Sequence, residues 1–228
     1  MSSFKQIPLL RILAEGAVIV VSILLAFGID AWWGGYQLRQ DERALLHELR
    51  NTLSEDLAGI AQEADTITLV RDRLESLIGM LDSGIEMDST EPEYQTAFHG
   101  LHRFVVLTVR YGPYETLKAR GLHLVSDQAL RVQLTSLYED GLPQVVNNSE
   151  LDQRLSRDRI LPFMLDRLAL EEEGIWVARD RIRDTTSLGL TLARYRLRTL
   201  DQFYLPSFNT TLRLMRETLV AIDRELET

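Results

Sequence analysis

The sequence predicts an all-α protein with an N-terminal transmembrane helix that continues into a long helix and then an up-and-down helical bundle. Residues 12–33 are apolar over a length that suits a bilayer. After Tyr36, apolar residues recur in steps of three, four and seven as far as the C-terminus, and glycine and proline are few. We therefore divide the chain into a tail (1–11), a transmembrane helix (12–33) and a helical, extramembrane domain (36–228).

The transmembrane prediction depends on length and on the flanking aromatic residues. Residues 13–31 would form a helix of roughly 28 Å, close to the hydrocarbon thickness of a bilayer. Ser22 is the only clearly polar residue between positions 16 and 29, and Trp32 and Trp33 follow where an interfacial anchor belongs. A cleaved signal peptide and a buried soluble helix are the alternatives. We favour a retained anchor because its apolar residues cover every face.

Two acidic residues, Glu15 and Asp30, bracket the uncharged core of this helix. They fall roughly 60° apart around a helix, so one interpretation is a carboxylate pair for ion passage. The simpler interpretation places each carboxylate at a membrane interface. Ser22 and Ala26 form a small-xxx-small pair that would allow two helices to approach closely.

Charged residues and the absence of cysteine bear on the membrane orientation of the chain and exclude some classes of function. Lys5 and Arg11 on the N-terminal flank are nearly balanced by Arg39, Arg43 and Arg50 on the other flank. Because the N-terminal tail is short, we expect the N-terminus inside and the body outside, which in a bacterium is the periplasm. A formal net charge of −9 argues against nucleic-acid binding. The chain has no cysteine, which excludes disulfides, cysteine nucleophiles and thiolate metal sites.

The body is predicted to begin with a long amphipathic helix that ends near residues 82–84. Gly34-Gly35 is a candidate hinge between membrane and body. Asp56 and Glu63 fall on positions that a two-stranded coil would keep apolar, so we expect the apolar stripe to drift towards Leu57 and Ala64, as in a bundle. The stripe itself has six apolar residues in strict heptad register: Leu46, Leu53, Ile60, Ile67, Leu74 and Leu81.

Proline, glycine and capping residues divide the remaining chain into further helices. Ser126 and Asp127 are the predicted caps of the third of these. No segment is predicted as a strand. The expected helices cover 92–110, 114–120, 128–140, 143–173 with a kink or break at Pro162, and 188–226 with a bend at Pro206.

In residues 11–57, an apolar span with an early Glu15 leads into Asp30-Ala31-Trp32 and then a charged helix with Leu-x-x-Leu spacing. In these features the segment resembles the start of an uncharacterised family of bacterial single-pass membrane proteins. Residues 114–138 resemble that family's middle region. The resemblance implies an inner-membrane protein with an N-terminal anchor and a helical body, and it supplies no activity. This chain departs from the family at Trp33-Gly34-Gly35, where the family usually has Asn, Glu and basic residues.

Two groups of residues are candidates for chemistry. His99 and His102 are three positions apart on one helix face and could share a metal, with His123 joining them, but isolated histidines on a helix surface give the same pattern. The second group surrounds the Gly112-Pro113 turn. It would bind an anionic ligand or a partner, or it is a helix corner in which the tyrosines pack and the charges pair: Arg110, Tyr111, Tyr114, Glu115, Lys118 and Arg120.

The sequence contains no P-loop, nucleophile elbow or dinucleotide fingerprint. We therefore expect no catalysis and no cofactor. The leading hypothesis is a membrane-anchored protein that acts through contacts, as a scaffold, a sensor or by self-association, with the bilayer, a second copy or a membrane protein as partner. The alternatives are an oligomeric pore or accessory subunit that uses Glu15 and Asp30, and a metal-dependent enzyme that uses His99 and His102.

Overall fold

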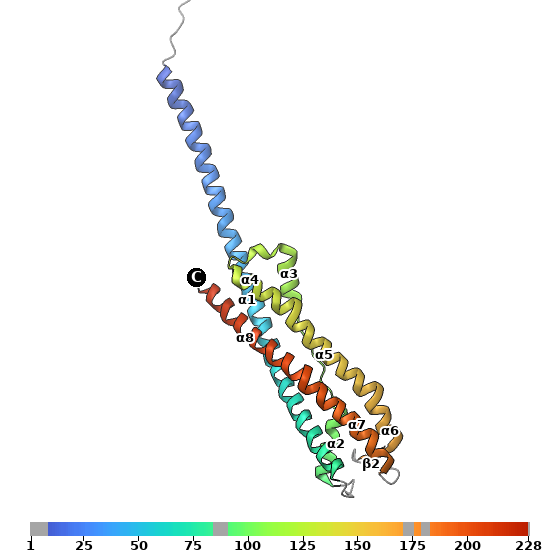
Figure 1. The fold of residues 1–228 in the computed structure, drawn as a ribbon. Coiled ribbons are helices and arrows are strands. Elements are labelled where there is room, and N and C mark those ends of the chain that lie inside the picture. Colours follow the sequence, from blue (N-terminus) through green and yellow to red (C-terminus); the bar gives the residue numbers. More distant parts are fainter. Residues whose placement is uncertain (1–8, 84–90, 171–175, 179–182, 228) are drawn as a thin grey trace, which may run out of the picture.

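A computed structural model describes residues 9–83, 91–170, 176–178 and 183–227. Within them, long helical rods lie side by side along one axis (Figure 1). The first rod is α1 (Leu9–Asp82). The prediction of an all-α fold with a long N-terminal helix is confirmed.

The helix α1 has two environments along its 74 residues. Its N-terminal part stands clear of the bundle, and its C-terminal part packs against α8, α2 and α7 (Figure 1). Of the predicted stripe, Leu46, Leu53, Ile60, Ile67 and Leu74 are buried in the core, and Leu81 is partly buried. The heptad pattern therefore identified the buried face of this helix correctly.

The candidate hinge at Gly34-Gly35 is wrong as a break in structure, because α1 runs through both glycines without interruption. Glycine permits a bend but does not impose one. A Cβ at either position would meet no neighbouring atom within 4 Å, so close packing does not require glycine there. The exposed apolar part of α1 and its core-facing part are one helix.

The second and third rods each contain π-helical turns. The second consists of α4 (Gln128–Thr135), η2 (Ser136–Gly141), α5 (Leu142–Leu155), η3 (Ser156–Ile160) and α6 (Leu161–Arg167). The third consists of α7 (Arg183–Thr199), η5 (Leu200–Tyr204) and α8 (Leu205–Leu226).

These π turns explain why three prolines lie inside helices. Pro143, Pro162 and Pro206 each stand two residues after a π turn ends. A proline ring clashes with the carbonyl four residues earlier, and a wider turn relieves that clash. The predicted helix end at Asp140-Gly141 is therefore wrong, and at Pro162 the rod continues instead of breaking.

The chain returns from the far end of α1 through α2 (Pro92–His102), then residues 103–111, α3 (Gly112–Arg120) and the short η1 (Leu122–Leu124). We call residues 103–111 the strap. The strap is not helical, so the predicted helix over 92–110 is wrong after His102. Its β-branched residues favour extended backbone, which covers about twice the distance per residue of a helix.

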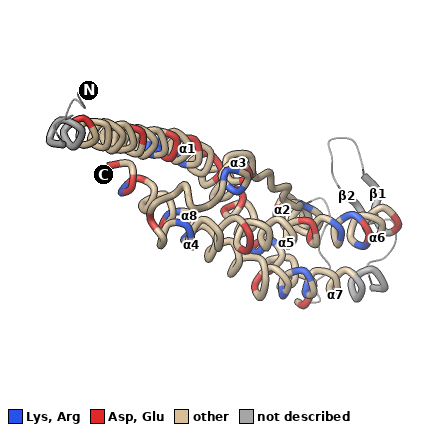
Figure 2. Tube along the Cα trace, turned by 90° about the horizontal axis from the view of Figure 1, so that it is seen from above, with Lys and Arg blue, Asp and Glu red and all other residues tan. Residues whose placement is uncertain are grey.

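The predicted helix over 143–173 is also too long. After α6, β1 (Leu168–Leu170) pairs in antiparallel register with β2 (Trp176–Ala178), which forms a small ribbon at the end of the bundle away from the protruding part of α1 (Figure 1). Residues 171–173 lie outside the described residues. Acidic and basic residues are intermixed along the rods of the body (Figure 2), which fits their role as a solvated surface.

Candidate functional site

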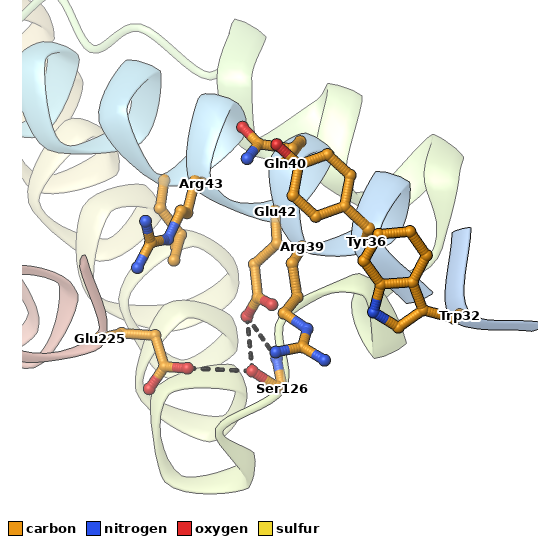
Figure 3. Close-up of a pocket in the computed structure, with 9 residues that line it drawn as sticks. Trp32, Tyr36, Arg39, Gln40, Glu42, Arg43, Ser126 and Glu225 are labelled. Carbon is orange, nitrogen blue, oxygen red and sulfur yellow. Dashed lines mark hydrogen bonds between the residues drawn. The ribbon is translucent and has the colours of Figure 1, made fainter. Parts of the chain in front are cut away.

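A polar pocket lies where α1 leaves its exposed apolar stretch and enters the bundle (Figure 3). We call it the junction pocket. Its volume is about 480 Å³, and most of its wall comes from one face of α1, with Ser126 before α4 and Glu225 on α8 opposite. The residues that α1 contributes are Trp32, Tyr36, Arg39, Gln40, Glu42, Arg43 and Leu46.

Local structure holds Ser126 in the pocket wall. Gly121 ends α3 with a φ of 103°, a conformation that favours glycine, and turns the chain into η1. Asp127 then caps α4 by accepting a hydrogen bond from the backbone N–H of Ala129 at 2.8 Å. Of the two predicted caps, Asp127 is confirmed, and the side chain of Ser126 instead faces Glu42.

Ser126 joins two carboxylates. Its backbone N–H donates to Glu42 Oε1 at 2.6 Å, and its Oγ lies 2.8 Å from Glu42 Oε1 and 2.9 Å from Glu225 Oε1 (Figure 3). Glu42 is only 8% exposed. Because a hydroxyl has a single hydrogen, it donates to one carboxylate at a time. Each carboxylate can accept several hydrogen bonds, so both remain able to receive a donor from a ligand.

Two arginines and two aromatic residues complete the junction pocket. Arg39 and Arg43 are one turn apart on α1, and within the described residues neither guanidinium forms an ion pair or hydrogen bond. Trp32 and Tyr36 stack with ring centroids 6.3 Å apart. With Glu42 and Glu225, the pocket presents two positive and two negative side chains beside aromatic faces.

The junction pocket is not among the sites predicted from the sequence. A signal was present, because Trp32, Tyr36, Arg39 and Arg43 follow one another in steps of four, three and four and so share a helix face. Ser126 and Glu225 lie far away in the sequence, and only folding brings them to that face.

The predicted anchor residues all lie on the exposed part of α1. An 18-residue window there has a mean hydropathy of 1.9 and none of it is buried inside the structure, so the helix is long and apolar enough to cross a membrane. Ser22 donates its hydroxyl to the carbonyl of Val18 at 2.8 Å, which satisfies it within the helix. Glu15, Ala26 and Asp30 are exposed, as are Trp32 (67%) and Trp33 (51%).

The structure brings the tyrosines of the predicted corner into a packed cluster. Tyr114 stacks on Tyr138 with centroids 4.5 Å apart, and Tyr111 meets the same ring edge-on at 6.2 Å. Burial raises the pKa of Tyr111 and of Tyr114, so both stay neutral. We call Tyr111, Tyr114 and Tyr138 the tyrosine cluster.

The charged residues of the same corner pair with neighbouring acids. Lys118 Nζ lies 2.9 Å from Glu139 Oε1 and 3.5 Å from Glu115, and Arg120 lies 3.7 Å from Asp41. The hydrogen bond between Lys118 and Glu139 raises the pKa of the lysine and lowers that of the glutamate. These pairings favour the interpretation as a helix corner over an open anion site.

Arg110 connects the strap to α1. Its backbone N–H donates to Asp56 Oδ2 at 3.0 Å, and its guanidinium pairs with Glu55. Asp56 is only 5% exposed, and burial raises its pKa. Asp56 therefore occupies the core-facing position itself, and Leu57 beside it is partly buried. The expected drift of the stripe is wrong at this position, because the strap supplies a partner for the carboxylate. One heptad later the drift is confirmed, because Ala64 is buried.

The rings of His99 and His102 lie 5.6 Å apart on α2. They share a hollow with Arg73 and Arg103, whose positive charges oppose the binding of a metal cation. Burial lowers the pKa of His102, and His99 and Arg196 lower it further. Among the described residues no cluster of three or more possible metal ligands is found, and His123 lies apart on η1.

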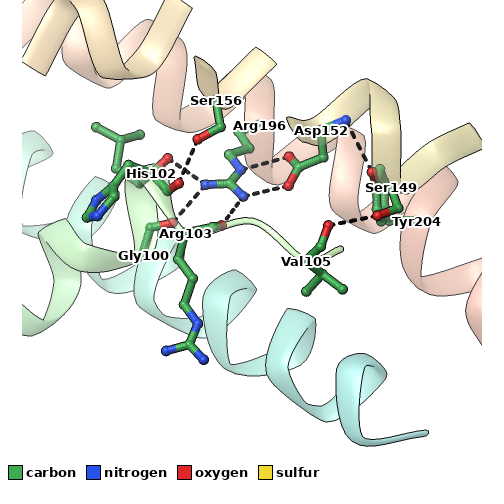
Figure 4. A network of polar contacts seen from close by, with 10 residues as sticks. Gly100, His102, Arg103, Val105, Ser149, Asp152, Ser156, Arg196 and Tyr204 are labelled. Carbon is green, nitrogen blue, oxygen red and sulfur yellow. Dashed lines mark hydrogen bonds and ion pairs between the residues drawn. The ribbon is translucent and has the colours of Figure 1, made fainter. Parts of the chain in front are cut away.

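A buried charge network holds the start of the strap (Figure 4). Arg196 on α7 donates to both oxygens of Asp152, at 2.9 Å and 2.7 Å, and to the backbone carbonyls of Gly100, Leu101 and Arg103. The hydroxyls of Ser149 and Ser156 donate to the carbonyls of Val105 and His102, respectively. The hydroxyls, the guanidinium and the carboxylate of this network all have protein partners, as in a structural network.

A comparison of the chain with protein-family models, with curated proteins and with solved structures finds no match.

Proposed function

We propose that this chain is a single-pass membrane protein whose helical body acts through contacts with other proteins in or near the same bilayer, and not through catalysis. The single observation that supports this most is the continuity of α1, whose exposed apolar stretch and core-facing stripe belong to one helix. Because the same helix would be both the membrane anchor and a core element, the body would have a fixed orientation relative to the bilayer.

The geometry suits a scaffold. From Tyr36 to Asp82, α1 extends roughly 70 Å at about 1.5 Å per residue, so the end of the body that carries α2 and the ribbon would stand well away from the bilayer surface. Arg196 and Asp152 are paired inside the body, and the rings of the tyrosine cluster pack on one another, which fits a rigid body better than a catalytic site.

In this proposal the N-terminal tail lies in the bacterial cytoplasm and the body in the periplasm, an orientation that the short N-terminal tail favours. Extraction of membranes with alkaline carbonate should leave the chain in the pellet. Reporter fusions at Ser3 and Thr228 should report opposite sides of the membrane. A soluble product that begins near Asp30 would contradict the anchor.

The first partner to test is a second copy of the chain, because Ser22 and Ala26 leave a small, exposed surface on the anchor. The chain has no cysteine, so single Ala26→Cys and Leu53→Cys variants can be oxidised in membranes. Disulfide dimers are expected with Ala26→Cys only, because Leu53 is fully buried within the body. Efficient dimers through Leu53→Cys would contradict the intramolecular bundle and would indicate a coiled coil between two chains.

A further inference from the structure

We propose that the junction pocket binds the phosphoethanolamine headgroup of a membrane phospholipid. This inference rests on the proposed membrane anchor and adds a ligand that the contact function does not require. Three features of the described residues carry it: the position of the pocket, its balance of charges and its connection to an apolar groove.

The position of the pocket is that of a membrane interface. It begins at Trp32, where the exposed apolar stretch of α1 ends, and continues to Leu46, which is buried in the core of the body. Trp32, Trp33 and Tyr36 are all large, exposed aromatic residues at this level, and such residues settle among lipid headgroups. If α1 spans a bilayer, the pocket opens at the height of the headgroups.

The charges of the pocket match a zwitterion. Arg39 and Arg43 offer guanidinium donors that are unused within the described residues, and arginine recognises phosphate well. Glu42 and Glu225 both lie within hydrogen-bonding distance of the Ser126 hydroxyl, and a carboxylate accepts several donors, so a primary ammonium with three N–H donors would bind both of them. An anionic glycerol headgroup would offer the carboxylates no cation. A choline headgroup has a cation without N–H donors.

A neighbouring groove suggests a lipid and not a free headgroup. A shallow apolar hollow on the exposed part of α1 is lined by Val21, Leu24, Leu25, Gly28, Ile29 and Trp32. Trp32 belongs to both the hollow and the junction pocket. A headgroup held by the arginines and glutamates would therefore have its acyl chains beside the apolar face of the same helix.

The test uses the full chain in detergent, titrated with dioleoyl phospholipids that carry ethanolamine, choline or glycerol headgroups, with bound lipid counted by native mass spectrometry. We expect the ethanolamine lipid to bind at least about tenfold more tightly than the other two, since charge-assisted hydrogen bonds are worth that much. Soluble glycerophosphoethanolamine should bind more weakly than the lipid. Equal affinity for all three lipids, or equal affinity for the soluble headgroup, would overturn the proposal.

Two variants test which side chains bind the phosphate of the headgroup and which bind its ammonium. Arg39→Gln with Arg43→Gln should lower the affinity for the ethanolamine lipid at least about tenfold. Glu225→Gln should abolish the preference for the ethanolamine lipid over the choline lipid. The control Arg154→Gln with Arg157→Gln removes two exposed arginines of α5 and η3 and should change nothing. The same loss in the control would overturn the site.

Carbonate extraction separates this proposal from the anchor on which it rests. Wild-type chain that stays in the membrane pellet but shows no headgroup preference contradicts the headgroup site alone. Wild-type chain that is released by carbonate contradicts the anchor.

Discussion

Arg196 and Asp152 form an ion pair of 2.7 Å between α7 and α5 with side chains that are only 1% and 5% exposed. The same guanidinium donates to three backbone carbonyls around the start of the strap, so one side chain joins α7, α5 and the end of α2. A buried pair adds little net stability compared with apolar residues, but the loss of one partner leaves a buried charge without compensation.

Arg196→Met should therefore destabilise the protein by about 3–5 kcal/mol, measured by denaturant unfolding in detergent. Its control is Arg194→Met, two residues earlier on the same helix, which breaks an exposed pair with Asp82 and should cost no more than about 1 kcal/mol. Adding Asp152→Leu to Arg196→Met should recover part of the loss. An Arg196→Met variant as stable as the wild type would show that the network is not formed.

The stripe on α1 gives the second prediction. Ile60→Ala and Ile67→Ala remove methyl and methylene groups from the core and should each cost about 2–5 kcal/mol. Glu55→Ala and Asp65→Ala, on the exposed face, should cost roughly 0.5 kcal/mol or less. Melting curves of the four variants decide this. If the isoleucine variants have the same melting temperature as the wild type, the stripe faces solvent and is not part of the core.

The third prediction concerns pH and His102. Its pKa is lowered in the folded state, chiefly by burial and then by His99 and Arg196, so the unfolded chain binds a proton more readily. Stability should therefore be retained above the ordinary histidine pKa of about 6.5 and should fall as the pH decreases below it.

His102→Gln should flatten this dependence between about pH 8 and pH 5, and the exposed His47→Gln variant should leave it unchanged. Free energies of unfolding at the two pH values give the comparison. A larger acid loss in His102→Gln than in the wild type would contradict the assignment.

The fourth prediction tests the continuity of α1. Gly34→Ala with Gly35→Ala places methyl groups in open space within a helix and should stabilise the chain by roughly 0.5–1 kcal/mol per site. Gly121→Ala should act in the opposite direction, because its φ of 103° disfavours other residues and a Cβ would come within 2.5 Å of His123. Thermal unfolding followed by circular dichroism measures both. If the Gly34 and Gly35 changes destabilise the chain, the hypothesis of a hinge at these glycines would be supported.

Patterns over a few turns were sufficient for much of the fold. The apolar span before Trp32, the heptad stripe from Leu46, the stop at Gly121 and the cap at Asp127 all follow from the preferences of neighbouring residues. The packing of the tyrosine cluster was one of two predicted alternatives, since a turn that brings aromatic residues together lets them bury their rings.

The remaining features required partners that are distant in the sequence. The strap is extended because Arg196 and Ser149, from other helices, satisfy its carbonyls, and a local pattern cannot show those donors. The carboxylate of Asp56 is buried because Arg110, 54 residues later, donates to it. The junction pocket likewise exists only because Ser126 and Glu225 fold onto α1. The sequence by itself determined which helix faces are apolar, and tertiary structure decided which polar groups could leave water, because burial of a polar group depends on the partners that folding brings to it.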